Sequence, residues 1–171
     1  IFADIFHVTD RFPLYFAILA LSVSAASFFN SRLVVRLGMR RLIFYAFLFL
    51  TIISNILAIY LIQFTASSPP LWMFMLYMMS AFFTLVFLFG NLNALAMQPL
   101  GHVAGFGSSI LGFVQSSIAV VVGVTLGHFL HDRITPLVLS FGVISMICIF
   151  ILTLEVNFRS KRNRHQSELT P

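Results

Sequence analysis

The chain has 171 residues, of which 60% are hydrophobic and 9% are charged, and its mean hydropathy is +1.01. A typical soluble domain carries about 25% charged residues because it faces water on every side, so this composition excludes a soluble enzyme and indicates an integral membrane protein. The formal net charge of +5 comes from basic residues beside apolar runs, which indicates membrane topology rather than nucleic-acid binding.

Long uninterrupted apolar runs predict membrane-spanning helices. A helix rises 1.5 Å per residue and needs about 20 apolar residues to cross about 30 Å of hydrocarbon. The runs are continuous rather than alternating, which favours helices over barrel strands. The predicted spans cover residues 13–29, 42–64, 71–97, 103–130 and 134–156.

These spans predict an all-α polytopic bundle over residues 1–156, in which residues 1–8 are the end of a preceding span. Short links between spans predict that consecutive helices are antiparallel neighbours. The polar segment 157–171 has no apolar periodicity and is expected to be a disordered cytoplasmic tail. The first residues contain neither an initiator Met nor a signal-peptide pattern, so we expect the chain to be truncated at its start.

Basic residues near span ends predict the orientation, because they accumulate on the cytoplasmic side. Two clusters are separated by an even number of spans and therefore lie on one face of the membrane. The opposite face holds only Arg11 and Arg133. The face assigned to the cytoplasm carries Arg32, Arg36, Arg40 and Arg41 before the second span and Arg159, Lys161, Arg162 and Arg164 after the fifth.

Amides inside the third and fourth spans are candidate substrate-pathway residues, because polar side chains in the bilayer need a partner or water. They are Gln115, Asn91 and Asn93. Asn91 and Asn93 are two residues apart and point in different directions, so at most one of them faces a shared cavity. The alternative for each amide is an ordinary interhelical hydrogen bond.

The fourth span carries a stripe of small residues, mostly four apart, which allows close approach of another helix. The interpretations are a tight structural contact or a helix that slides against a partner during transport. The residues are Ala104, Gly105, Ser108, Gly112, Ser116, Ala119, Gly123 and Gly127.

No catalytic, metal or cofactor site is expected. The single Cys148 offers no paired thiolate. Ser109 and His128 are 19 residues apart on one span, roughly 28 Å by the helical rise, which is too far for proton transfer.

The segment from Ser31 to Arg41, SRLVVRLGMRR, resembles the cytoplasmic loop signature of the major facilitator superfamily. Arg36, Gly38, Arg40 and Arg41 match it, and Ser31 and Val35 replace its usual Gly and Asp. Asn30 ahead of Arg32 resembles the Bcr/CflA drug-resistance branch of this superfamily. The resemblance is to the second copy of the motif, between the eighth and ninth helices. We expect Arg36, Gly38 and Arg40 to act as a conformational latch; the alternative is orientation by positive charge alone.

Residues 90–109, followed by Gly112 and Gln115, resemble the tenth-to-eleventh helix region of the Bcr/CflA drug-resistance branch. The resemblance implies the carboxy-terminal six-helix half of a multi-pass transporter of the bacterial inner membrane. It implies proton-coupled efflux of a drug-like or amphipathic small molecule, by rocking against a missing amino-terminal half that carries the coupling residues. The competing hypothesis is a non-transporting membrane scaffold or assembly module, and a homodimer of halves is a third.

Overall fold

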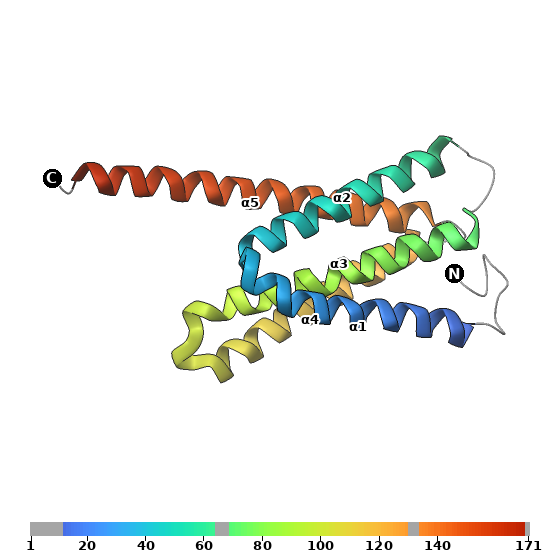
Figure 1. Ribbon diagram of the computed structural model, residues 1–171, viewed down its shortest axis with the longest axis horizontal. Helices are drawn as coiled ribbons and strands as arrows, with labels where there is room; N and C mark the ends of the chain where they lie inside the picture. The colour runs from blue at the N-terminus through green and yellow to red at the C-terminus, as the bar shows by residue number, and fades with distance from the viewer. Residues whose placement is uncertain (1–11, 64–68, 130–133, 170–171) are drawn as a thin grey trace.

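The computed structural model describes residues 12–63, 69–129 and 134–169, and every regular element in these ranges is helical (Figure 1). The predicted all-α class is confirmed. The predicted stub over residues 1–8 lies outside the described residues. The elements are α1 (Phe12–Leu37), α2 (Met39–Gln63), α3 (Leu71–Met97), the short 3-10 helix η1 (Gln98–Val103), α4 (Ala104–Phe129) and α5 (Thr135–Leu169).

The five α-helices are each long and apolar enough to cross a membrane, so the chain is a multi-pass membrane protein. The third helix begins and ends where its predicted span does. The ends of the other helices differ from those of their predicted spans by between one and thirteen residues. α4 is one residue shorter at each end, and the largest differences are extensions at the end of α1 and the end of α5.

Both of these extensions continue a helix past the apolar part of the sequence. α1 runs on to Leu37 because residues 30–37 contain no Gly or Pro to stop it. α5 runs on to Leu169 for the same reason, through residues such as Arg, Lys, Gln and Glu that are good helix formers. The disorder predicted for the tail is therefore not observed over residues 157–169, where the backbone is helical.

The packing centres on α2, which lies against both α3 and α5, while α1 packs mainly on α3. Consecutive helices do contact one another, as expected, but the main partner of α1 is α3 and the main partner of α5 is α2. The small buried residues Ser22 and Ala26 of α1 face the core, and the Ser22 hydroxyl donates to the carbonyl of Met79 on α3 at 2.8 Å. Close approach through small residues is the usual basis of helix pairing in membranes.

Two interhelical side-chain hydrogen bonds hold α2 to its neighbours. The hydroxyls of Ser54 and Tyr77 are 3.0 Å apart between α2 and α3. The Thr51 hydroxyl donates to that of Ser145 on α5 at 2.8 Å. All four side chains are buried, so each bond satisfies polar groups that neither lipid nor water can reach.

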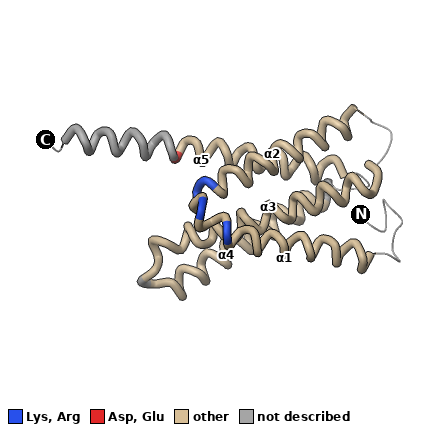
Figure 2. The backbone as a smooth tube through the Cα atoms, in the orientation of Figure 1, with Lys and Arg blue, Asp and Glu red and all other residues tan. Residues whose placement is uncertain are grey.

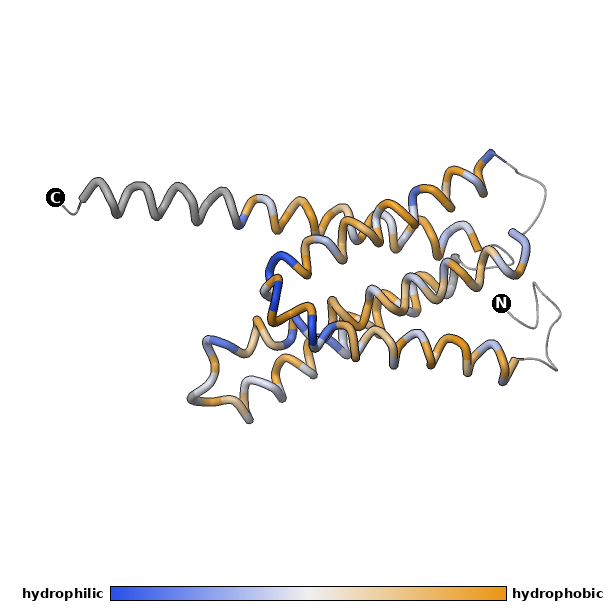
Figure 3. The backbone as a smooth tube through the Cα atoms, in the orientation of Figure 1, coloured by the Kyte–Doolittle hydropathy of each residue, from blue (hydrophilic) through white to orange (hydrophobic). Residues whose placement is uncertain are grey.

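Within the part of the chain that the structure describes, the charged residues gather at one end of the bundle, while the body of the helices is apolar (Figures 2 and 3). The arginines of the α1–α2 corner and Glu155 of α5 lie at the same end. This is the end that the distribution of basic residues assigns to the cytoplasm, and the assignment itself stays a prediction.

Candidate functional site

The amide of Gln115 on α4 meets that of Asn93 on α3. Gln115 Nε2 donates to Asn93 Oδ1 at 3.0 Å. Asn93 Nδ2 in turn donates to the carbonyl of Phe89 within its own helix at 2.8 Å. Gln115 is exposed and Asn93 is half-buried, so the pair lies on the surface of this chain where α3 and α4 meet.

Asn91 has a different environment. It is 3% exposed, and its Nδ2 donates to Asn30 Oδ1 on α1 at 2.6 Å and to the carbonyl of Phe87 at 2.7 Å. The structure therefore brings Asn93, and not Asn91, beside Gln115. Asn91 instead joins α3 to α1 as an interhelical hydrogen-bonding residue.

The surroundings of the Asn93–Gln115 pair are unusual, because none of the most apolar part of α4 is buried. Apart from short contacts with α3, η1 and α5, the helix stands free of the bundle. An exposed amide pair on a helix that carries an apolar surface on every side can bind a polar group of an otherwise apolar molecule. It can equally hydrogen-bond a further helix.

The small-residue stripe of α4 also faces no neighbour within the described part of the chain. A side chain added at Gly105, Gly112, Gly123 or Gly127 would meet no atom within 4 Å. Ser108 is exposed, and its hydroxyl donates to the carbonyl of Gly105 in its own helix. The predicted packing role of these residues stays a prediction, which requires a partner outside the described residues.

The arginine motif forms a corner between two helices instead of the expected loop. Arg32 and Arg36 lie on the last turns of α1, and Arg40 and Arg41 lie on the first turn of α2. Only Gly38 separates the helices, with a φ of +78° that L side chains rarely adopt. Its N–H donates to the carbonyl of Val34 at 3.0 Å, the hydrogen bond of a helix that ends in a left-handed residue.

The side chains of this corner differ in their partners. Arg40 Nη1 lies 3.3 Å from Glu155 Oε1 and forms an ion pair between the start of α2 and the end of the α5 span. Both side chains are nearly half exposed, so the pair contributes about 0.2–1 kcal/mol of stability. The Arg32 guanidinium lies over the Phe28 ring, 4.3 Å from its centroid, as a cation–π pair.

Two partners in these sites, Glu155 and Asn30, are not among the predicted site residues. Glu155 is the only acidic residue between Asp132 and Glu168. The span count places it on the same face as the arginines, so charge alone could have identified it. Asn30 carries no comparable signal, because its role depends on α1 packing against α3 rather than α2.

Among the described residues, no group of three or more His, Cys, Asp or Glu side chains could hold a metal ion. No protein family, curated protein or solved structure matches the chain.

Proposed function

We propose that this chain is the carboxy-terminal half of a secondary active transporter of the major facilitator type, which exports drug-like or amphipathic small molecules in exchange for protons. The single observation that carries the proposal is the Asn93–Gln115 hydrogen bond on the exposed face between α3 and α4. In the proposed complete transporter, this face lines the central cavity against the amino-terminal half. The amides bind a polar group of the substrate, and the apolar helix surfaces bind the rest of it.

The test is the substitution Gln115→Leu in the full-length protein. We expect it to change which compounds the cell exports while membrane abundance stays near normal, because the side chain is exposed in this chain. Asn93→Leu should have the same effect. Thr125→Val on α4 is the matched control, because the Thr125 hydroxyl bonds only to the carbonyl of Val121 in its own helix.

Asn91→Leu separates a pathway role from a packing role. It should lower abundance without changing the export profile of the surviving protein, because Asn91 is buried against α1. If Gln115→Leu behaves like Asn91→Leu, Gln115 is a structural residue and the proposed pathway is wrong.

The Arg40–Glu155 ion pair is proposed as part of a cytoplasmic latch that forms in one state of the transport cycle and breaks in the other. Arg40→Glu and Glu155→Arg should each slow export, and the double exchange should restore it, because the exchanged charges can still pair. Arg40→Lys, which keeps the charge but loses the guanidinium fork, should slow export less. Equal export by all variants would reject the latch. The arginines would then serve only to orient the chain in the membrane by their positive charge.

A membrane scaffold is the second candidate, favoured by the exposed small-residue stripe of α4. It predicts that Gly112→Leu abolishes association with another membrane protein, while Gln115→Leu has no effect on export. The transporter hypothesis predicts instead that Gln115→Leu changes the substrate profile more than Gly112→Leu does.

A further inference from the structure

A pocket of about 450 Å³ opens at the arginine end of the bundle, between the start of α2, the end of α3 and α5. It is separate from the Asn93–Gln115 pair. Of the residues that line it, only Arg40 and Glu155 have a part in the proposed transport, as the latch. Its lining combines charged and apolar side chains. Those that matter here are Arg41, Phe44, Leu95, Leu152 and the Arg40–Glu155 ion pair.

The described side chains that line this pocket include two cations and one anion. The cations are the guanidiniums of Arg40 and Arg41, and the carboxylate of Glu155 lies next to Arg40. Arg41 is exposed and forms no ion pair or hydrogen bond with the rest of the described chain. The pocket therefore attracts an anion, and the guanidinium of Arg41 is free to bind it with two parallel hydrogen bonds, as arginine does with phosphate.

The opposite wall of the pocket is apolar. Leu95, Leu152 and Phe44 are all half-buried, so part of each surface stays open. A ligand that matches both a cation and an apolar wall has an anionic group and a hydrocarbon chain, so it is an anionic amphiphile. Because Glu155 lies at the end of the apolar run of α5, just before the polar segment 157–171, the pocket lies at the depth where hydrocarbon gives way to lipid head groups.

We propose that this pocket binds an anionic phospholipid, with Arg41 contacting the phosphate and an acyl chain lying along Phe44, Leu95 and Leu152. Basic pockets between helices on the cytoplasmic side are a recurring site for such head groups. The sequence adds a basic run directly after the span, Arg159, Lys161, Arg162 and Arg164, which concentrates anionic lipid nearby. The inference does not depend on the proposed transport.

The test uses the full chain in phosphatidylcholine vesicles that contain a small fraction of phosphatidylglycerol with brominated chains, which quench indole fluorescence on contact. The reporter is an indole at the pocket, introduced by Tyr45→Trp in a Trp72→Phe background, because Tyr45 also lines the pocket. We expect brominated phosphatidylglycerol to quench this reporter at a several-fold lower lipid fraction than brominated phosphatidylcholine.

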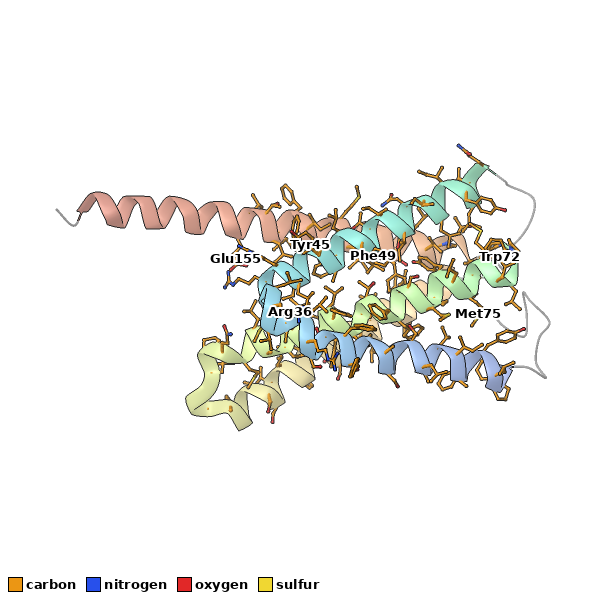
Figure 4. The ribbon with its side chains drawn as sticks, in the orientation of Figure 1. Arg36, Tyr45, Phe49, Trp72, Met75 and Glu155 are labelled. Atoms are coloured by element: carbon orange, nitrogen blue, oxygen red, sulfur yellow. The ribbon has the colours of Figure 1, made fainter. Side chains whose placement is uncertain are left out.

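Trp72 in the otherwise native chain is the positional control, because it lies at the far end of the bundle from Tyr45 and Glu155 (Figure 4). It should show no preference for either lipid. An equal preference for phosphatidylglycerol at both positions would mean that the whole protein surface attracts anionic lipid. This result would reject the proposed lipid site.

Arg41→Gln should lower the preference at the pocket at least about tenfold, because a neutral amide replaces the two charged hydrogen bonds of the guanidinium. Arg36→Gln is the matched control: it removes the same charge at the same end, but Arg36 does not line the pocket. A specific site predicts a much smaller loss for Arg36→Gln. Equal losses for the two variants would reduce the effect to surface potential and reject the proposal.

Soluble anions distinguish the lipid from a free phosphate. Inorganic phosphate and glycerophosphate, each added at millimolar concentration, should leave the quenching by brominated phosphatidylglycerol unchanged, since neither supplies the acyl chain. If either restores the fluorescence, the pocket binds a soluble phosphate compound and the lipid assignment is wrong.

Discussion

The helices α2 and α4 are similarly apolar, yet they have opposite environments in the fold. Half of the most apolar part of α2 is buried between α3 and α5, whereas none of that part of α4 is buried. α2 combines large apolar side chains with hydroxyls that bond to both neighbours. On α4, a Cβ added at Gly105, Gly112, Gly123 or Gly127 would meet no atom of the described chain within 4 Å. Hydropathy thus identifies a membrane span, but it does not indicate how much of that span is buried against its neighbours.

The strongest test of this comparison places one bulky side chain against the buried helix α2 and another on the exposed helix α4. Gly142 of α5 is buried, and a Cβ there would already lie 3.5 Å from Ser54 Cβ of α2. Gly142→Leu should therefore destabilise the chain by about 1–3 kcal/mol. Gly112→Leu on α4 should have almost no effect, because nothing lies within 4 Å. Thermal unfolding of the purified chain in detergent measures both, and equal losses would contradict the difference between the helices.

A substitution at Gly38 tests the one-residue connection between α1 and α2. Gly38→Ala forces an L side chain into a left-handed conformation and should cost about 1–2 kcal/mol, although space for the methyl group is available. Gly105→Ala in the first turn of α4 should instead be neutral or stabilising, since Ala is the better helix former. The same unfolding measurement applies, and a Gly38→Ala variant as stable as the native chain would show that the corner tolerates another backbone conformation.

The hydroxyl contact between α2 and α5 should have a smaller effect. Thr51→Val removes the hydrogen bond to Ser145 and should cost about 0.6 kcal/mol, the average for interhelical bonds in membrane proteins. Thr125→Val on α4 removes a hydroxyl that bonds only within its own helix and should cost less. Reversible unfolding in mixed micelles can resolve the difference, and a larger loss at Thr125 would show that α4 has a partner there.

The ion pair between α2 and α5 should also have a small effect, and this effect should depend on salt. Arg40→Gln should cost at most about 1 kcal/mol, and the loss should shrink in high salt because the pair is nearly half exposed. Unfolding at low and high ionic strength measures this. A salt-independent loss would mean that Arg40 stabilises the chain through packing of its stem rather than through its charge.

Much of the fold follows from the sequence, because apolar length sets where a helix crosses the membrane. The sequence could not give the helix ends of α1 and α5 by the same rule. Polar residues mark the edge of the hydrocarbon, as at Asn30, but a helix stops only where the backbone requires it, as at Gly38. Polarity marks the end of the membrane span and not the end of the helix, so the predicted spans are shorter than α1 and α5.

The candidate site was predictable only in part. The spacing of Asn91 and Asn93 requires that they face different directions, and the structure agrees. Which of the two meets Gln115 depends on the side of α3 that α1 covers. That choice is made by contacts between helices that are not consecutive, which a single sequence does not reveal.

The single residue between α1 and α2 leaves the chain no slack at this corner. The Cα atoms of Leu37 and Met39 can be at most about 7 Å apart, so a rigid displacement of α1 must be passed on to the start of α2. By comparison, seven residues, 64–70, separate α2 from α3. A displacement of α1 therefore also displaces Arg40 at the start of α2, and with it the ion pair between Arg40 and Glu155 of α5.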